Sequence, residues 1–412
     1  MLAQSRRISA IYLKEISLKG LKSIASHCGP SLQILVAEVD GKAIKLIQSI
    51  CQACPNLTVL RLENFVNNAS PDKLILTAVR YCPRIRVLPS ALLELTDVAV
   101  SVLASLHTLT ELKLNRYDSD DSESIQRVLQ ANPHLTWISL DGGYIDASLV
   151  SCIARCCGEL ERLELMKGPF TGGDPVDINT LFSNALLDLF RGCTHLEEFT
   201  LHQASEFTGE LLRALFRYCP MLTSLDLFIN SATPPSTGPV LDASYPTLSK
   251  LSVQGYGVAE SAVRDMFTHC TNLQEVTLRN YKQATDATIR ILLQRCTKLN
   301  TLLLWFCTNM TINAMLYVAT HCPTLKFLVC GNMPVNDEVL AYLSASCPGL
   351  TMLILQYCHS GPITEVGVLG LAERCSGMTH LCIHGNLLEP LTPTLNRMKR
   401  GELYKHILFD CD

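Results

Sequence analysis

The stretch Cys296–Phe306, CTKLNTLLLWF, contains a spacing that recurs along most of the chain. Its frame is a leucine (Leu299), two variable residues, an apolar residue (Leu302), one variable residue and a second apolar residue (Leu304). Cys296 stands three positions before the first leucine. Complete copies of this frame begin at Leu57, Leu160, Leu196, Leu222, Leu273, Leu325, Leu350 and Met378. Self-similarity at a fixed period predicts a solenoid, in which each unit buries its apolar side against its neighbours.

When incomplete copies are counted, the frames begin at residues 8, 32, 57, 85, 109, 135, 160, 196, 222, 248, 273, 299, 325, 350 and 378. The frame reads as a short strand followed by a loop and a helix, so we expect an α/β solenoid of about fifteen repeats. The array is expected over residues 1–386 and a C-terminal cap or tail over residues 387–412. Parallel strands lie about 4.8 Å apart and helices about 8 to 10 Å apart, which predicts a curved horseshoe with a concave sheet and outer helices.

Composition agrees with an aliphatic repeat protein. Of the 412 residues, 48% are hydrophobic and 6% aromatic, which suits a long core of leucines better than an aromatic-rich sandwich. No apolar run reaches the roughly 18 residues that would cross a membrane, so a soluble chain without a membrane is expected. The net charge is -4 and the pI is near 6.3. General nucleic-acid binding is therefore not expected, because proteins with that function carry a broad basic surface.

Nineteen cysteines would suggest disulfides in a small secreted protein, but here their placement follows the repeat. Equivalent positions of neighbouring units stack, and reduced cysteine is often buried, so we expect a column of buried thiols in a reducing, intracellular compartment. Cys51 and Cys54 form a C-x-x-C, but no second pair follows at the spacing of a zinc site. The members of this cysteine column are Cys54, Cys82, Cys157, Cys193, Cys219, Cys270, Cys296, Cys322, Cys347 and Cys375.

The opening MLAQSRRISAIYLK allows two interpretations. Its basic residues without an acidic one resemble a mitochondrial presequence, whereas Ile8, Ile11 and Leu13 fit the first strand of the array. We expect the strand. The location predicted from the whole sequence is therefore cytoplasmic or nuclear, with a mitochondrial location as the alternative.

The motif C-P-x-L-x-x-L-x-L followed by a Thr/Asn-Asp helix start resembles the cysteine-containing leucine-rich repeats of F-box/leucine-rich-repeat proteins. The matching helix starts are Thr96-Asp97, Thr285-Asp286 and Asn336-Asp337, whose first side-chain oxygens are expected to accept hydrogen bonds from free helical amides. The resemblance covers residues 8–386 and implies partner binding without chemistry. It does not extend to the F-box: the apolar segment 88–103, LPSALLELTDVAVSVL, lies inside the repeat frame, and no other segment offers that helical module.

Two irregular segments interrupt the repeat. KGPFTGGDPVDINT, residues 167–180, is expected to form a projecting loop because of its glycines and prolines, and it lacks the spacing of a phosphate-binding loop. SATPPSTGPVLDASYP, residues 231–246, replaces a helix, and we expect an extended crossing on the convex side, with a recognition loop as the alternative.

Evidence for catalysis, a metal or a cofactor is weak. The motifs H-E-x-x-H and G-x-S-x-G and the dinucleotide glycine fingerprint are all missing, so we expect a protein that is not an enzyme and needs no cofactor. His380, Cys382 and His384 alternate along an expected strand and would share one side of it. Their spacing along the strand is wide for three ligands on one metal ion, so a polar end to the concave face is the preferred interpretation.

The candidate binding residues are the strand positions that face outward. From Glu111 to Arg279 these positions carry a mixed and slightly acidic set of side chains, whereas beyond Leu299 they become apolar. Exposed apolar surface on a repeat protein indicates a partner, or a segment of the same chain that covers it; the tail 387–412 is the alternative cover. The predicted partner-binding residues, which we call the apolar patch, are Leu303, Trp305, Phe306, Phe327, Val329, Met352, Ile354 and Tyr357.

The sequence therefore predicts a non-enzymatic leucine-rich-repeat scaffold or adaptor that binds a protein partner, alone or within a multi-subunit complex, through its concave face. A small-molecule substrate is not expected. One alternative is the substrate-recognition subunit of a ubiquitin ligase. A second alternative is a structural subunit of a large cytoskeletal or mitochondrial assembly.

Overall fold

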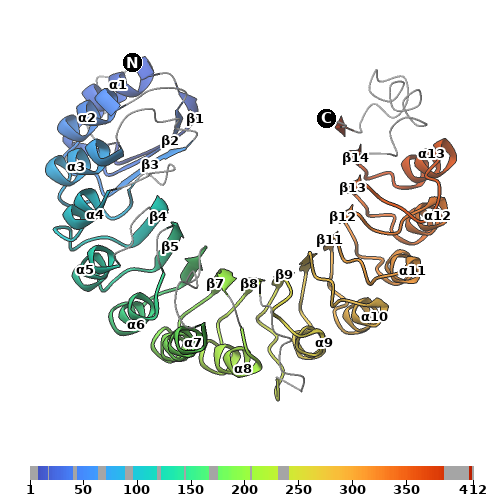
Figure 1. Ribbon diagram of the computed structural model, residues 1–412. Helices are drawn as coiled ribbons and strands as arrows, with labels where there is room; N and C mark the ends of the chain where they lie inside the picture. Colours follow the sequence, from blue (N-terminus) through green and yellow to red (C-terminus); the bar gives the residue numbers. More distant parts are fainter. Residues whose placement is uncertain are drawn as a thin grey trace. The chain divides into compact units, whose positions relative to one another are not determined.

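A computed structural model of the chain describes residues 8–16, 18–39, 44–63, 71–88, 96–117, 122–142, 145–166, 175–204, 207–230, 241–384 and 408–410. In these ranges short strands and helices alternate along the chain (Figure 1). Contacts divide the chain into two compact units. The first comprises Met1–Gln203 and Arg217–Met221, and the second comprises Ala204–Phe216 and Leu222–Asp412.

The first unit contains two groups of parallel strands, each with its helices. One group pairs β1 (Ala10–Ile16), β2 (Ile34–Val39) and β3 (Val59–Glu63), in that order. The other group pairs β4 (Glu111–Tyr117), β5 (Trp137–Gly142), β6 (Arg162–Leu165) and β7 (Glu198–Ala204). The helices are α1 (Leu18–Cys28), the 3-10 turn η1 (Gly29–Ser31), α2 (Ile44–Ala53), α3 (Pro71–Tyr81), α4 (Asp97–Leu103), α5 (Glu123–Ala131), α6 (Ala147–Cys156) and α7 (Pro175–Gly192).

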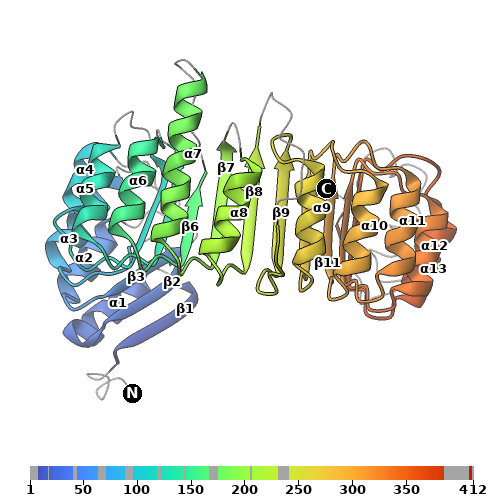
Figure 2. The same ribbon diagram turned by 90° about the horizontal axis from the view of Figure 1, so that it is seen from below.

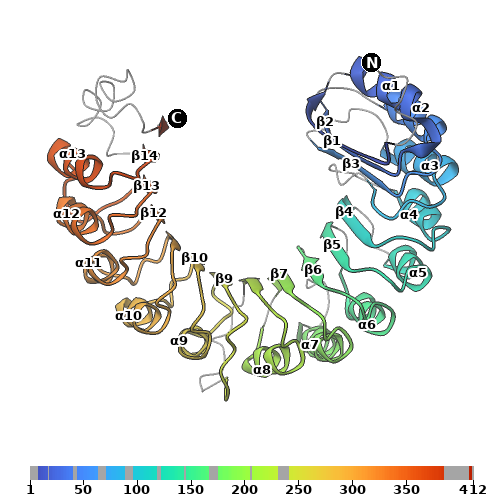
Figure 3. The ribbon, with the colours of Figure 1, turned by 180° about the vertical axis from the view of Figure 1, so that it is seen from behind.

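The second unit is a series of parallel strands paired in sequence order. Its strands are β8 (Ser224–Ile229), β9 (Lys250–Gly255), β10 (Glu275–Arg279), β11 (Thr301–Trp305), β12 (Phe327–Gly331), β13 (Met352–Gln356), β14 (His380–His384) and β15 (Leu408–Asp410). Its helices are α9 (Glu260–His269), α10 (Asp286–Arg295), α11 (Ile312–His321), α12 (Asp337–Ser346) and α13 (Glu365–Arg374), while α8 (Gly209–Tyr218) is divided between the units. Helices α9–α13 lie on one side of the strands, as Figures 2 and 3 show from two further directions.

The repeat frame predicts where each described strand begins. Every strand from β1 to β14 starts two residues after an expected frame start, for example at Thr301 after Leu299. The frame at Ile85 is different, because Val87 forms only an isolated bridge to Val59. The α/β leucine-rich-repeat solenoid, with parallel strands and helices in alternation, is confirmed.

The frame leucines build the core. Leu299, Leu302 and Leu304 are all 0% exposed, and the corresponding residues of the repeats that begin at residues 109 to 378 are buried in the same way. Burial of each such side chain contributes about 1.5–3 kcal/mol, and because the leucines of one repeat pack on the next, that energy holds neighbouring repeats together.

All ten cysteines of the column are buried, as predicted, and the described cysteines are free thiols. The structure adds a reason for their position. The Cys347 thiol donates to the carbonyl oxygen of Cys322 at 3.3 Å, and the Cys193 thiol donates to that of Cys157 at 3.4 Å. Each of these bonds joins one repeat to the repeat before it. Burial raises the pKa of Cys193 and Cys347 to about 12, so these thiols are poor nucleophiles.

Helix starts are linked from repeat to repeat by hydrogen bonds between an acidic side chain and a threonine. Asp286 accepts from the Thr311 amide at 2.8 Å and from its hydroxyl at 2.6 Å, and Asp337 accepts the same pair from Thr364 at 2.8 and 2.5 Å. We call these the carboxylate–threonine links. Gly367 leaves room for one of them, since a Cβ at Gly367 would lie 2.2 Å from Asp337 Oδ1.

The predicted helix caps are correct at two of three positions. Asn336 accepts a hydrogen bond from the Val339 amide at 3.1 Å, as expected for a cap. Thr285 forms a capping box, in which its side chain accepts from the Thr288 amide and the Thr288 hydroxyl accepts from the Thr285 amide at 2.9 Å. At Thr96 the prediction was wrong, because its side chain caps no helical amide and its hydroxyl donates to Asp72 of the preceding repeat at 2.8 Å.

The two irregular segments differ in outcome. Helix α7 begins at Pro175, so the expected loop over 167–180 was wrong for its last six residues; proline is favoured in the first turn of a helix, where its missing amide costs nothing. Residues 167–174 lie outside the described ranges, as do 231–240. In residues 241–246 no helix forms, and the Leu241 and Tyr245 amides donate to Asp265 and His269 of α9 at 2.5 and 3.0 Å. This described part crosses on the helix side, as expected.

The apolar segment 88–103 forms part of a repeat. Helix α4 occupies Asp97–Leu103 with Val100 and Leu103 buried, and residues 89–95 lie outside the described ranges. In the part of the chain that the structure describes, none of the helices has the length and apolar character that a membrane crossing requires.

Candidate partner-binding face

Each strand of the second unit has one covered side and one open side. In β11 and β13 burial alternates along the strand, with Leu302, Leu304, Leu353 and Leu355 turned toward the helices and buried. The first, third and fifth residues point the other way, because side chains alternate along a strand. We call the side that they form the open strand face.

The register of β11, β12 and β13 brings the apolar patch together on this face. Phe327 lies beside Thr301 and Met352, and Leu303 pairs with Val329 and Val329 with Ile354. Phe327 is 38% exposed, and Leu303, Met352 and Ile354 are half-buried. Three neighbouring strands therefore present apolar side chains on the side opposite the described helices α10–α13.

Val329 is the member of the patch that the structure buries. Only 7% of it is exposed, although its position in β12 is an outward one. In register it lies between the larger side chains of Leu303 and Ile354. The expectation that Val329 itself is open to a partner was therefore wrong, because strand alternation gives the side of the sheet but not the size of the neighbours.

Trp305 lies against its neighbouring strand, and Gly331 makes this possible. A Cβ at Gly331 would lie 2.2 Å from Cε3 of the Trp305 ring, so only glycine leaves room for the indole at that position of β12. On the other side, the Arg279 guanidinium of β10 lies 5.8 Å from the ring centroid, within the range of a cation–π contact. The ring is half-buried and its orientation is set by both neighbours.

Phe306 and Tyr357 lie at the edge of the patch, directly after β11 and β13. They are 40% and 60% exposed, and both have a positive φ, 52° and 51°. The residues that follow them, Cys307 and Cys358, turn inward and donate to the carbonyl oxygens of Leu278 and Cys330 at 3.5 and 3.4 Å. The sequence indicated Phe306 and Tyr357 as neighbours of the patch, and the structure places them there.

The described tail residues extend the strand series. Leu408 pairs with His380, Phe409 with Leu381 and Asp410 with Cys382, so β15 adds to the open edge of β14. Residues 385–407 lie outside the described ranges, so the alternative that the tail covers the apolar patch stays a prediction.

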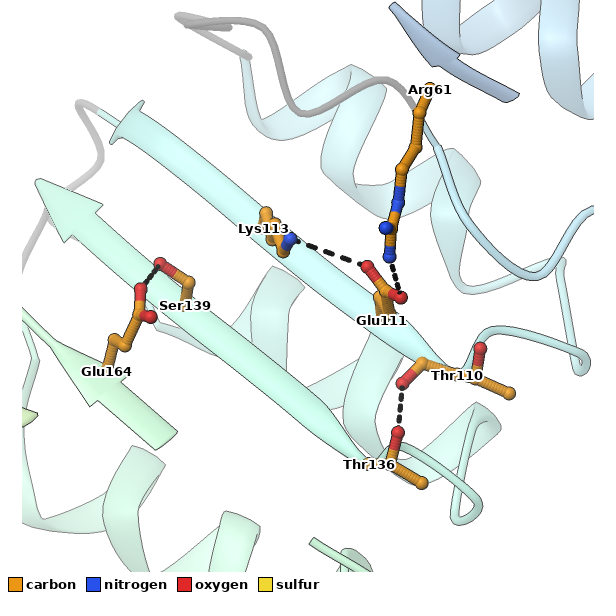
Figure 4. Close-up of polar contacts among 7 residues, drawn as sticks. All are labelled: Arg61, Thr110, Glu111, Lys113, Thr136, Ser139 and Glu164. Atoms are coloured by element: carbon orange, nitrogen blue, oxygen red, sulfur yellow. Dashed lines mark hydrogen bonds and ion pairs between the residues drawn. The ribbon is translucent and has the colours of Figure 1, made fainter. Parts of the chain in front are cut away.

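The open strand face of the first unit is built differently, from paired charges (Figure 4). Glu111 of β4 contacts Arg61 of β3 and lies 3.4 Å from Lys113 Nζ. Ser139 donates to Glu164 at 2.6 Å, on the neighbouring strands β5 and β6. Charged and polar side chains thus occupy positions on this face that are apolar in β12 and β13 of the second unit.

Trp137 lies at the centre of these charges. Lys113 Nζ is 3.1 Å from the centroid of its ring and the Arg162 guanidinium is 5.0 Å away, while Arg162 also pairs with Glu198 at 3.4 Å. Burial lowers the pKa of Lys113, although Glu111 opposes that shift. The Lys113 amine against the Trp137 ring is in the range of a cation–π contact.

A metal site requires a cluster of ligating side chains. Among the residues that the structure describes, no group of three or more His, Cys, Asp or Glu side chains could hold a metal ion. Nδ1 of His380 lies 2.8 Å from the Thr379 hydroxyl, and nothing is described of the His384 side chain, so the metal interpretation of this strand gains no support.

Sequence reasoning did not single out Gly331, Asn332 or the role of Arg279. Two signals could have indicated them. A glycine at an outward strand position opposite a tryptophan predicts a ring lying across the strand, and an arginine one strand away on the same register predicts a contact with that ring.

Comparisons with known proteins find similar sequences among curated proteins and similar folds among solved structures. The chain is 24% identical over 322 residues to GRR1-like protein 1 of Arabidopsis thaliana, a match that covers 76% of this chain and 49% of that protein. The chain thus spans about half the length of the curated relative that it matches. Among solved structures it is similar to a chain of the Rad7 and Elc1 complex of yeast, with a TM-score of 0.44, 18% identity, and coverage of 84% of this chain and 74% of that one.

No family model matches the sequence. The assignment therefore rests on the repeat itself: the recurring leucine frame, the alternation of parallel strands and helices, and thiols such as those of Cys193 and Cys347 that donate to the repeat before them. With these features, the chain is a leucine-rich-repeat protein.

Proposed function

We propose that this protein is a non-enzymatic scaffold or adaptor that binds a protein partner through the apolar patch of the second unit. The observation that supports this most is the change in the open strand face between neighbouring strands. At one equivalent position the face carries Lys250, Glu275, Thr301 and then Phe327, and from Phe327 on the position is apolar in β12 and β13. Phe327 is 38% exposed on a strand, so part of its apolar ring is not buried by folding. That exposed part is available to contact another protein.

The patch is also of the right chemical kind. Binding energy at protein interfaces concentrates in a few aromatic anchors surrounded by less important contacts. Trp305 is held in place by Gly331 and Arg279, so its ring loses little conformational freedom when a partner binds. Leu303, Met352 and Ile354 supply half-buried aliphatic surface around it.

The test is affinity purification of the full-length protein with mass spectrometry, comparing Phe327→Ser with Lys250→Ser. Both residues occupy the same position of the face, and the lysine is paired with Glu275 at 3.6 Å on the polar side. Loss of an aromatic anchor is expected to weaken binding by about 2 kcal/mol, roughly thirtyfold in Kd, whereas Lys250→Ser leaves the partner bound. A partner that remains bound to Phe327→Ser and is lost from Lys250→Ser refutes this location.

The same experiment distinguishes the alternative functions. Recovery of ubiquitin-ligase adaptor subunits supports a substrate-recognition subunit, which the resemblance of the repeats to F-box/leucine-rich-repeat proteins favours as the second candidate. Recovery of a complete cytoskeletal or mitochondrial particle supports a structural subunit. One dominant binder in the cytoplasm or nucleus supports a dedicated adaptor.

A further inference from the structure

Four repeats of the second unit share an unusual backbone conformation at the carboxyl end of the strand. The residue directly after each of β10, β11, β12 and β13 has a positive φ of 50° to 53°: Asn280, Phe306, Asn332 and Tyr357. Gly255, at the equivalent position of β9, has a φ of 88°. The left-handed turn is thus a property of the repeat and not of one residue type.

The residue types at this position are of two kinds. Glycine and asparagine adopt the left-handed conformation with little strain, whereas a bulky aromatic residue in it is a real exception. Phe306 and Tyr357 are such exceptions, and yet their rings are 40% and 60% exposed. The next residue, Cys307 or Cys358, is the one that packs in the core. The two rings therefore add backbone strain and exposed apolar surface at a position where the fold does not require an aromatic side chain. Strained residues that the fold does not need are concentrated at functional sites.

The two rings have a polar residue between them. Asn332 is the equivalent residue of the intervening strand, and its side-chain amide makes no hydrogen bond within the residues that the structure describes. Strand spacing of about 4.8 Å puts positions two strands apart about 10 Å from each other. We call Phe306, Asn332 and Tyr357 the aromatic rim.

Positive charges lie on the Phe306 side of the rim. Arg279 and Lys282 are exposed there, near the rings of Trp305 and Tyr256 at 5.8 and 5.5 Å. Asp286 and Asp337 each accept two hydrogen bonds in the carboxylate–threonine links, and the exposed carboxylates Glu338 and Glu365 belong to the first turns of α12 and α13.

From this arrangement, and building on the proposed function, we propose that the aromatic rim binds an extended, acidic and proline-rich segment of the partner. In a polyproline II segment, residues three apart lie on the same side about 9 Å from each other, which matches the spacing of the two rings. Its backbone is free of internal hydrogen bonds, so Asn332 can bond to a peptide group between the two anchors, which a helix does not offer. Carboxylates beside the anchor that meets Phe306 are complementary to Arg279 and Lys282.

The experiment uses the full-length protein and fluorescein-labelled synthetic peptides in a fluorescence anisotropy titration. The probe DDELPPLP has two leucines three residues apart after an acidic start; KKKLPPLP reverses the charge, and DDESPPSP lacks the anchors. We expect DDELPPLP to bind at least about tenfold more tightly than either control, and Arg279→Glu to abolish the preference for the acidic peptide. Equal binding of the acidic and basic peptides refutes the inference, as does concentration-dependent self-association that displaces the peptide.

Asparagine is the natural matched substitution at the rim. Phe306→Asn and Tyr357→Asn introduce the residue that the same fold carries at positions 280 and 332, so folding is preserved and an unchanged circular dichroism spectrum checks this. The double variant is expected to lose at least about tenfold in affinity for DDELPPLP, while Tyr357→Phe retains it. Unchanged affinity of the double variant refutes the rim as the binding site.

Failure of this inference and failure of the proposed function give different results. If the cellular partner is lost from Phe327→Ser but retained by the rim double variant, the rim inference is refuted and the proposed function stands. If both variants retain the partner, both are refuted.

Discussion

Replacing Gly331 with alanine tests the contact that positions Trp305. The added Cβ would lie 2.2 Å from Cε3, 2.7 Å from Cδ2 and 2.8 Å from Cζ3 of the indole, whereas carbon atoms in contact lie about 3.5–4 Å apart. The ring must therefore move by more than about 1 Å. Overpacking of this kind costs about 1–3 kcal/mol, and the change from glycine to alanine in a strand returns about 0.5–1 kcal/mol. The difference between these two ranges runs from about 0 to 2.5 kcal/mol, so a net loss of stability of about 1 kcal/mol is expected.

The assay is tryptophan fluorescence during urea unfolding. The chain has 2 tryptophans, so in a Trp137→Phe background Trp305 alone reports. Gly331→Ala is expected to shift the native emission to longer wavelength, as the ring leaves its place beside β12, and to lower the urea midpoint. A native spectrum and a midpoint identical to those of the parent would show that the indole does not rest on Gly331, and the argument for a fixed anchor would fail.

Four further predictions follow from the described contacts. Gly370→Ala, in helix α13 where an added Cβ has no heavy atom within 4 Å, is expected to raise stability by about 0.5–1 kcal/mol in the same urea assay; a loss would contradict the reading of open space. The ten thiols of the cysteine column are expected to resist iodoacetamide until the chain unfolds, while the half-buried Cys156 and Cys382 react before them, as mass spectrometry of labelled peptides can show. Burial lowers the folded-state pKa of Lys113, so between the folded and unfolded pKa values the unfolded chain binds more protons, and the cost of burying the charge disappears as the pH rises through that window. The difference in unfolding free energy between Lys113→Met and the parent should therefore shrink toward about pH 10.4. A difference that stays constant with pH would argue against this effect. The predicted curvature of the repeat array, about 20° per unit from the different spacing of strands and helices, would be contradicted by the small-angle X-ray scattering of a straight rod.

The sequence predicted correctly those features that depend on residues within a single repeat. Strand starts such as Thr301 follow from the leucine frame alone, because the period of two places Leu302 and Leu304 on the covered side. The burial of the cysteine column follows in the same way from its fixed position. The side of the strand on which Phe327 lies was predicted correctly for the same reason.

Features that depend on the neighbouring repeat were missed. The burial of Val329 depends on the sizes of Leu303 and Ile354, and the direction of the Thr96 hydroxyl depends on an aspartate 24 residues earlier. The helix start at Pro175 was missed for a different reason: proline and glycine indicate a loop in general, but proline also fits the first turn of a helix. The backbone strain at Phe306 has no signature in the sequence.

The carboxylate–threonine links give the array a direction. In each link the acidic side chain belongs to the earlier repeat and the threonine to the later one, as for Asp286 with Thr311 and Asp337 with Thr364. A chain cut between two such repeats leaves different ends. On the earlier piece a carboxylate returns to water, where it is well hydrated, whereas on the later piece a helix loses the acceptor for its first amide and for its threonine hydroxyl. Where a link is present, the earlier repeat thus supplies acceptors that the start of the later helix needs, so a fragment that keeps the earlier repeat holds that helix start better than a fragment that begins after it.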